Sequence, residues 1–204
     1  MKDLKVNSEK RLIFVSKSNA KPMIIIESKR KSKESLEAQY PDAMIIDVTS
    51  KAQDEFVKFS PFYPHGGIPV PFSPNYDSMS VEGIWQGLKV FEEADIDTHS
   101  FRISDMKNLK RTVRKFGAPL GHRKGVNGEE LLGYIQARKL IYLPCYKWVL
   151  ENKLQKLVTA VRVISKNKPV VLLDYNTNPD VNDCKKPLSH ASLIKAYIEG
   201  NYPE

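Results

Sequence analysis

Cysteine and histidine are scarce in this sequence, and their scarcity excludes several classes of protein. Among the 204 residues there are only two cysteines, Cys145 and Cys184, and four histidines. Two cysteines cannot build the disulfide framework that supports many small secreted domains. No cysteine and histidine residues have the spacing of a zinc site, and we expect neither a metal site nor a cofactor.

Long apolar runs are absent as well. A run such as Met23–Ile26 spans four residues, whereas a helix that crosses a bilayer needs about 20. The first five residues, Met1 to Lys5, do not lead into the apolar core of a signal peptide. These features predict a cytoplasmic protein in a reducing compartment, without a membrane as partner.

Positive charge is what the sequence has in excess. Lys and Arg number 32 against 24 Asp and Glu, which gives a net charge of +8. Such an excess attracts anions, and nucleic acid, nucleotides and phosphorylated sugars are the usual candidates. A solvated basic surface without a specific partner explains the charge equally well. With 41% hydrophobic and 27% charged residues, the chain otherwise has the composition of an ordinary globular protein.

The first fifty-five residues have the pattern of a small α/β unit. Two β-branched runs, 23–26 and 43–48, predict strands, and helix-forming residues fill 31–39 between them. The sequence Tyr40-Pro41-Asp42 ends that helix. Because 204 residues are typical of one domain, we expect an N-terminal extension, residues 1–55, packed on a core domain, residues 56–204.

The core domain begins with an unusual stretch. Residues 60–77 contain five prolines and several aromatic residues, so they form an ordered loop that is either functional or a cover for the core. Beyond this stretch the apolar spacing predicts mostly helix. The expected elements are a helix over 80–93 that Ser80 caps, helices over 104–116, 129–140, 146–165 and 188–199, a basic loop over 121–125 and a strand over 170–173. The fold class that follows is α+β, mostly helical.

Polar side chains suited to catalysis gather at two places. Glu82, Gln86 and Lys89 are spaced to share one stripe of a helix, and the loop 174–183 is rich in carboxylates and amides. Carboxylates suit the cleavage of an N-glycosidic bond, because positive charge develops on the ribose as the base departs. Each place also has a plain explanation. The stripe is compatible with a solvated helix face, and the loop with an Asn/Asp turn.

Two segments resemble motifs of the NADAR superfamily. Residues 58–64 read Lys-Phe-Ser-Pro-Phe-Tyr-Pro, and residues 78–91 read Ser-Met-Ser-Val-Glu-Gly-Ile-Trp-Gln-Gly-Leu-Lys-Val-Phe. They are similar to the family's aromatic "S-N-F-Y-P" segment and to its "[ST]-V-E-H-x-[FYW]-Q-A-x-K-[FA]" helix. Residues 187–194 are similar to the family's closing element, so the resemblance covers roughly 56–200.

The resemblance implies a NADAR fold and an N-glycosidase without a cofactor. Its substrate would be an ADP-ribosylated base or a phosphoribosyl nucleotide-like molecule. Glu82 would be the catalytic carboxylate. The second would be Asp183, with Asp180 and Asp174 as alternatives. The substrate-binding residues that it implies are Tyr63 against the base, Gln86 and Lys89 for positioning, Asn178 on the opposite wall, and Arg123 and Lys124 for phosphate. Trp85 is a second stacking candidate, although its apolar stripe favours the core.

Two departures from the family pattern keep a rival interpretation open. Gly83 stands where the family has His, and the family's "D-x-x-W-G" signature is absent from the 174–183 loop. The missing Trp-Gly favours a non-catalytic module that binds ADP-ribose, a nucleotide or nucleic acid. Steep salt dependence of binding would distinguish a nucleic-acid module from an enzyme acting on a small metabolite.

Overall fold

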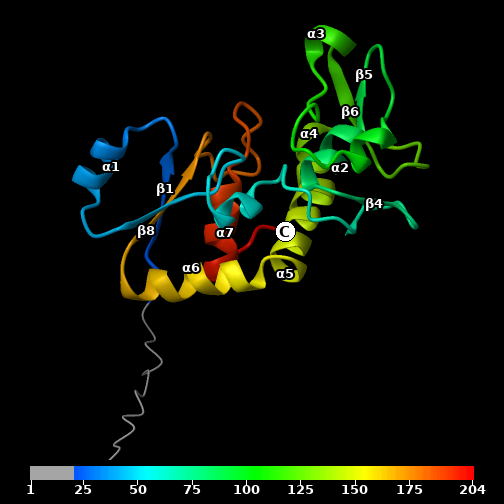
Figure 1. The fold of residues 1–204 in the computed structure, drawn as a ribbon. Helices are drawn as coiled ribbons and strands as arrows, with labels where there is room; N and C mark the ends of the chain where they lie inside the picture. The colour runs from blue at the N-terminus through cyan, green and yellow to red at the C-terminus, as the bar shows by residue number, and fades with distance from the viewer. Residues whose placement is uncertain (1–20) are drawn as a thin grey trace, which may run out of the picture.

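A computed structural model describes residues 21–204 of the protein. A parallel three-stranded sheet organises one half of the molecule. The strands β1 (Ile24–Ser28), β8 (Val170–Asp174) and β2 (Met44–Asp47) lie in the order β1-β8-β2. Ile24 and Met44 both pair with Val170, so all three strands end at the same edge. Figure 1 shows this sheet beside the helices of the second half. Residues 1–5, on which the prediction about a signal peptide depends, lie outside the described residues.

The central strand β8 is buried on both faces. Its residues alternate between two clusters, as the period of a strand requires. Val170 and Leu172 face the main core, whereas Val171 and Leu173 pack with Leu36 of α1 (Lys33–Gln39). The sheet therefore joins residues on both sides of the expected boundary at position 55, because β8 comes from the C-terminal part of the chain.

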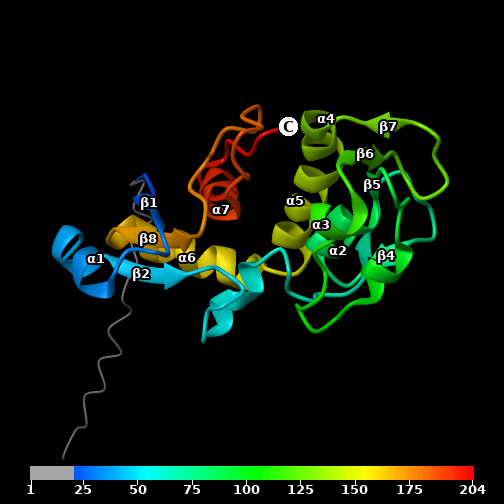
Figure 2. The same cartoon turned by 90° about the horizontal axis from the view of Figure 1, so that it is seen from above.

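Helices of the C-terminal part cover the core side of the sheet. The two helices α6 (Gln155–Asn167) and α7 (His190–Glu199) contact β8. In Figure 2, α7 lies between this sheet and α5 (Leu143–Asn152). Gly200 ends α7 in the left-handed conformation, with φ of 79°. The predicted strands 23–26, 43–48 and 170–173 and the predicted helices 31–39 and 188–199 are confirmed within two residues.

The second half of the molecule is built around α2 (Val81–Gly87), whose seven residues are all buried. The Ser80 hydroxyl accepts a hydrogen bond from the Gly83 N–H at 3.0 Å and caps the helix as predicted. The predicted length, to residue 93, is wrong. The chain leaves the helix at Leu88 and forms β5 (Lys89–Phe91), which pairs with β6 (Pro119–Arg123). Pairing with a distant strand has overridden the local apolar period.

The predicted basic helix over 104–116 is also wrong. A 3₁₀ helix, η2 (Thr98–Arg102), precedes an irregular segment, and only α3 (Val113–Phe116) is helical. Met106 and Asn108 have φ of 59° and 57°, which no right-handed helix permits. The predicted loop 121–125 belongs largely to β6, which pairs with β7 (Leu131–Leu132).

The predicted helices 129–140 and 146–165 are confirmed only in part, because the first begins at Tyr134 and a break at Lys153 divides the second. One interrupted helical column joins the first helix to the beginning of the second. It runs through α4 (Tyr134–Ala137), a π-helical turn, η3 (Arg138–Tyr142), and α5. Pro144 has no N–H to donate to the preceding turn, which favours the wider hydrogen-bonding pattern there. The column ends at Lys153, where the chain turns into α6.

The proline-rich stretch holds only short elements. These are η1 (Glu55–Phe59) just before it and the two-residue strands β3 (Ile68–Pro69) and β4 (Asp77–Ser78), which pair with each other. The overall architecture is α+β, and the described residues form three small sheets. Within residues 21–204, none of the helices combines the length and the apolar character needed to cross a membrane.

Candidate active site

A cavity of about 520 Å³ lies between the two halves of the molecule. It opens beyond the carboxyl ends of β8 and β2, which is where parallel sheets bind their ligands. Helix α2 and the π-helical turn form the facing wall. The lining residues include Arg30, Thr49, Ser50, Ser60, Phe62, Glu82, Trp85, Gln86, Lys110, Tyr134, Arg138, Tyr142, Asp174, Tyr175, Asn176 and His190. Its volume falls in the range of about 300–1,000 Å³ that is usual for small-molecule sites.

Glu82 brings a buried carboxyl group to the α2 wall. Only 7% of the residue is exposed. Its Oε1 accepts a hydrogen bond from Gln86 Nε2 at 2.7 Å, and Gln86 Oε1 accepts from Lys89 Nζ at 3.3 Å. Burial raises the pKa of Glu82, an effect that the Gln86 hydrogen bond and the charges of Lys89 and Lys110 oppose. Glu82 is therefore a carboxyl group poised to exchange a proton nearer to neutral pH.

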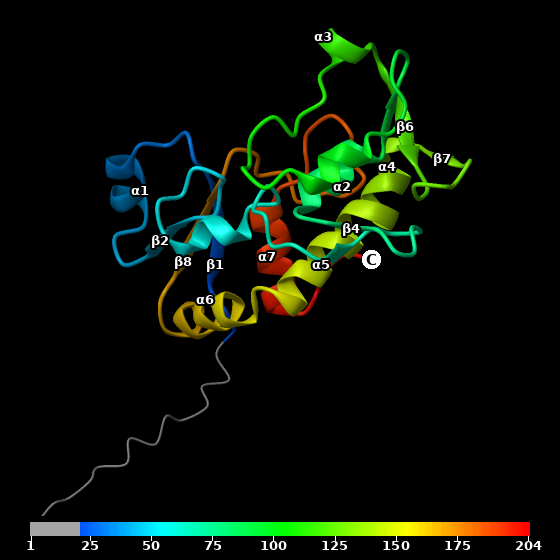
Figure 3. The same ribbon diagram turned by 45° about the vertical axis from the view of Figure 1, so that its right-hand side comes forward.

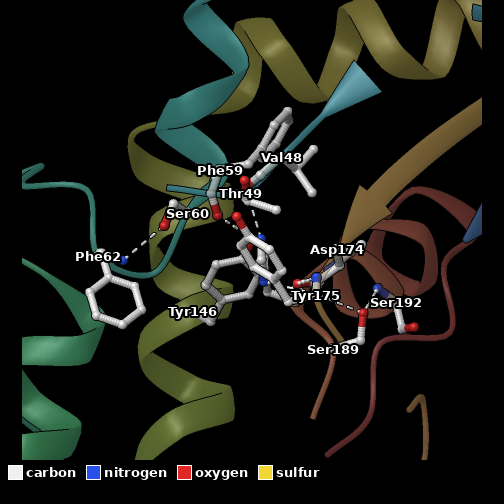
Figure 4. A network of polar contacts seen from close by, with 12 residues as sticks. Val48, Thr49, Phe59, Ser60, Phe62, Tyr146, Asp174, Tyr175, Ser189 and Ser192 are labelled. Atoms are coloured by element: carbon white, nitrogen blue, oxygen red, sulfur yellow. Dashed lines mark hydrogen bonds and ion pairs between the residues drawn. The ribbon is translucent and has the colours of Figure 1, made fainter. Parts of the chain in front are cut away.

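Asp174 brings a second carboxyl group to the sheet wall, in a contrasting setting. Its Oδ1 accepts from the Tyr175 N–H at 2.7 Å, and its Oδ2 accepts from the Ser189 hydroxyl at 2.9 Å and lies 3.0 Å from His190 Nδ1. Figure 4 shows Asp174 at the end of its strand, beside Ser189 and Tyr175. Burial alone would raise the pKa of Asp174, but the contacts with His190 and Ser189 outweigh it and lower the pKa.

His190 completes this group as an imidazolium. Its Nε2 lies 2.8 Å from the Val48 carbonyl oxygen, while Nδ1 faces Asp174. Both nitrogens meet acceptors, so both carry a proton. Burial would lower the pKa of His190, but the charge of Asp174 prevails and raises it. Asp174 and His190 are therefore a buried ion pair that ties the end of β8 to the end of β2.

Aromatic rings form much of the wall between the two carboxyl groups. The Trp85 ring centroid lies 5.7 Å from those of Tyr134 and Tyr142, in both cases edge to face. On its other side Trp85 lies 3.8 Å from the ring of His122. Phe62 lines the cavity as well. Such rings suit a planar base, which stacks on aromatic side chains.

The cavity wall also carries three cationic side chains, Arg30, Lys110 and Arg138. Arg138 is 2% exposed, and its guanidinium donates to the carbonyl oxygens of Val181, Asp183 and Lys186 at 2.7–3.0 Å. Within residues 21–204, Arg138 forms no ion pair with a carboxylate. Its charge therefore adds to a positive potential in the cavity, which favours an anionic ligand.

The structure brings only part of the predicted site together. Glu82 and Gln86 line the cavity, whereas Lys89 lies in β5, does not line the cavity and contacts Gln86 from behind the lining residues. Trp85 lines it too, and it also belongs to the main hydrophobic core, as its apolar stripe predicted. Among the alternatives for the second carboxylate, Asp174 lies on the cavity wall, whereas Asp180 and Asp183 do not.

The other predicted binding residues lie away from the cavity. Arg123 pairs with Asp95 at 2.7 Å, and Lys124 pairs with Glu130 at 2.7 Å. The Tyr63 ring packs at 4.8 Å from His65. Asn178 bonds within its own loop, where its side-chain amide meets the carbonyl oxygens of Asp180 and Lys186. None of these four side chains lines the cavity.

Sequence reasoning missed several residues of the cavity wall. Three separate parts of the chain, which meet only in the fold, supply these residues: the turn after β1 supplies Arg30, η3 supplies Arg138 and Tyr142, and α7 supplies His190. One signal was available for His190, since it directly follows the capping residue of a helix that faces the strand end at Asp174. Arg138 was missed because three of its four hydrogen-bond acceptors are backbone carbonyls more than forty residues away, and only the Tyr134 hydroxyl is local.

The glycine at position 83 has a steric explanation. A Cβ atom at this position would stand 2.8 Å from the Ser100 carbonyl oxygen and 2.9 Å from the Ser78 hydroxyl oxygen. These distances are shorter than real Cβ contacts. Helix α2 therefore approaches η2 so closely that residue 83 has no room for a side chain.

The chain belongs to a family of unknown function, DUF6939, whose model matches residues 28–194. The match takes in every residue that lines the cavity, from Arg30 to His190. It also includes most of the parallel sheet and both halves of the molecule. No curated protein matches the chain.

Proposed function

We propose that this protein is an N-glycosidase that hydrolyses the bond between a base and a ribose. Its substrate is an ADP-ribosylated base or a phosphoribosyl nucleotide-like molecule. The observation that carries the proposal is the carboxyl group of Glu82, which is buried, has a raised pKa and lines a cavity with aromatic and cationic walls. The resemblance of residues 58–91 to the NADAR superfamily supports the same activity, the NADAR fold and a cytoplasmic location.

The reaction needs one water and one proton carrier. The water oxygen attacks the anomeric carbon of the ribose as the carbon–nitrogen bond to the base breaks. Glu82 takes a proton from the water and returns it to the departing base, so the carboxylate is regenerated. The products are the free base and a ribose with a new hydroxyl group. A raised pKa suits such a carrier, because burial makes the carboxylate a stronger base toward the water proton than an exposed glutamate.

The remaining walls hold the two ends of the substrate. The base stacks among Trp85, Tyr134 and Tyr142, and the phosphate lies toward Arg30, Lys110 and Arg138. Asp174 and His190 together carry no net charge, so they leave the positive potential of those cations intact. Asp174 acts here as a positioning residue, because its bonds to His190, Ser189 and Tyr175 hold it ionised.

A mass-spectrometric hydrolysis assay tests this function. It compares wild type, Glu82→Gln and the control Glu151→Gln on ADP-ribosylated guanine in oligonucleotides and on free phosphoribosyl nucleotides. Glu151 is an exposed glutamate of α5 that does not line the cavity. We expect wild type and Glu151→Gln to release a base and a sugar phosphate or ADP-ribose, and Glu82→Gln to release neither. Equal turnover by wild type and Glu82→Gln would exclude the mechanism.

One observation favours a second candidate, a non-catalytic module that binds ADP-ribose or a nucleotide. Both oxygens of Asp174 are engaged, so only one of the two cavity carboxyl groups remains free for proton transfer. A binding module would hold the same ligands with unchanged affinity in wild type and Glu82→Gln, and neither protein would turn them over. Calorimetric titration with free ADP-ribose, combined with the hydrolysis assay, separates the two functions.

A further inference from the structure

Most of the protein's net charge is concentrated in a short part of the chain that adjoins the cavity. Residues 102–124 contain eight Lys or Arg and one Asp, a net charge of +7 out of the chain's +8. Within this part, residues 107–115, here termed the basic segment, hold five basic residues and no acidic one. A lone basic helix is usually a solvated face, but most of this segment is irregular, and only residues 113–115 belong to the short helix α3.

Arg111 fixes the basic segment to the cavity wall. Its guanidinium donates to the carbonyl oxygens of Lys89 at 2.6 Å and Asp95 at 2.7 Å, and it lies 4.9 Å above the Phe91 ring. Its backbone N–H donates to the Gln86 side chain at 3.2 Å. Figure 3 shows the chain before α3 passing beside α2. The segment is therefore held against the same Glu82–Gln86–Lys89 chain that forms the proposed catalytic wall.

The other four cations of the segment are available to a partner. Lys107, Lys110, Arg114 and Lys115 are all exposed. Across the described residues, none of them pairs with a carboxylate. Lys110 lines the cavity and lies 5.7 Å above the Phe62 ring. Nearby basic residues behave differently, because Arg102, Arg123 and Lys124 each pair with an acidic side chain.

We infer that the basic segment binds the phosphate backbone of a polynucleotide strand whose base enters the cavity. A free nucleotide would fill the cavity and use Arg30, Lys110 and Arg138, which leaves Lys107, Arg114 and Lys115 without a role. A strand carries one phosphate for each nucleotide, so its charge continues outside the cavity where these three cations lie. An enzyme that acts on a base in a strand must also take that base out of the stack into a pocket.

The aromatic rings of the cavity favour a nucleic acid over other polyanions. Phe62, Trp85 and Tyr142 line the cavity, and Phe62 also lies beneath Lys110 of the segment. Base stacking on such rings is sequence-tolerant. An acidic protein or an anionic membrane offers negative charge but no planar base. The role of this strand as substrate rests on the proposed N-glycosidase function, whereas its binding can be measured without turnover.

Fluorescence anisotropy with an unmodified, labelled single-stranded oligonucleotide of mixed sequence tests the inference. The variant is Lys107→Glu/Arg114→Glu/Lys115→Glu. The matched control is Lys153→Glu/Lys156→Glu/Lys168→Glu, three exposed lysines at the ends of α6 that change the net charge equally. Glu82→Gln is included because it removes turnover without touching the segment. Thermal unfolding checks that each variant is folded.

We expect wild type and Glu82→Gln to bind the oligonucleotide with equal affinity. A plot of log affinity against log salt concentration should have a slope of about −3, because each of four phosphate contacts contributes roughly −0.7. In the segment variant the slope should weaken to about −1, because one of the four contacts remains, whereas the control should keep most of the wild-type slope. Absence of wild-type binding, equal losses in both triple variants, or equally tight binding of polyglutamate would overturn the inference. Failure of hydrolysis with intact binding would reject only the proposed function.

Discussion

The two carboxyl groups on the cavity wall, those of Glu82 and Asp174, differ in their hydrogen-bond partners and in the direction of their pKa shifts. Glu82 has one short side-chain hydrogen bond, from Gln86, and burial raises its pKa. Asp174 is held by a hydroxyl, a backbone N–H and an imidazolium, and its pKa is lowered. Where two acids in one site have pKa values pushed apart, their roles differ as well. We assign proton transfer to Glu82 and the stability of the cavity wall to Asp174.

The largest effect that this comparison predicts is the loss of activity in Glu82→Gln. Removing a proton carrier lowers turnover by about 10²–10⁴-fold. Because the folded state bears the cost of burying the Glu82 charge, the variant should be as stable as wild type or more stable at neutral pH. Steady-state rates and thermal unfolding measure the two effects. A variant that loses stability and activity together would mean that Glu82 supports the fold.

Asp174→Asn should show the opposite behaviour, with a large loss of stability. The substitution leaves the buried His190 imidazolium without its counter-charge, which costs about 3–5 kcal/mol of unfolding free energy. Urea denaturation measures the loss. Asp183→Asn is the matched control, because Asp183 lies off the cavity wall. It should change stability by no more than about 0.5 kcal/mol and leave activity intact. Equal losses of unfolding free energy in Asp174→Asn and Asp183→Asn would contradict the structural role that we assign to Asp174.

Gly83→Ala tests how closely the Glu82 wall is packed. The new methyl group would meet the Ser100 carbonyl and the Ser78 hydroxyl, so we expect a loss of about 1–3 kcal/mol, reduced by the higher helix propensity of alanine. Urea denaturation again measures it. Gly133→Ala is the control, since the nearest atom to its Cβ is 3.7 Å away. A neutral effect at Gly83 would show that α2 can move away from η2.

The smallest predicted effect is a pH dependence of protein stability that arises from the Asp174–His190 pair. The folded-state pKa of His190 is raised above its unfolded-state pKa. The contribution of His190 to the free energy of unfolding is therefore complete below the unfolded-state pKa and is lost as the pH rises through the folded-state pKa. The pKa of Asp174 is lowered, so its contribution is lost only as the pH falls through that lowered value. In His190→Gln the decline on the alkaline side should flatten. Unfolding midpoints measured across a pH series would reveal an unchanged profile if the pair does not exist.

The elements that sequence could predict are those decided by neighbouring residues. The β-branched run at 23–26 and the Ser80 cap depend on local preferences, and the structure confirms both. Helix α2 was predicted too long because its end depends on the pairing of β5 with β6. The apolar spacing of Met106, Leu109, Val113 and Phe116 suggested a helix, yet Arg111 is held by groups from α2 and β5 instead.

The same distinction applies to the site. Glu82 and Gln86 were grouped correctly on one helix face, because residues four apart meet there. The choice among Asp174, Asp180 and Asp183 depends on which of them ends the central strand, and Arg138 depends on a loop that folds back over it. These relations involve strand order and long-range contacts, which one sequence does not specify locally.

The most direct test of the central assignment is hydrolysis in water enriched in oxygen-18, with wild type and Glu82→Gln compared on the same substrate. Attack of water at the anomeric carbon places the label on the ribose and none on the released base or the phosphates. We predict a singly labelled sugar product from wild type and no such product from Glu82→Gln. Label on a phosphate, or equal labelling of the sugar by both proteins, would contradict the role of Glu82 in cleaving a base–ribose bond.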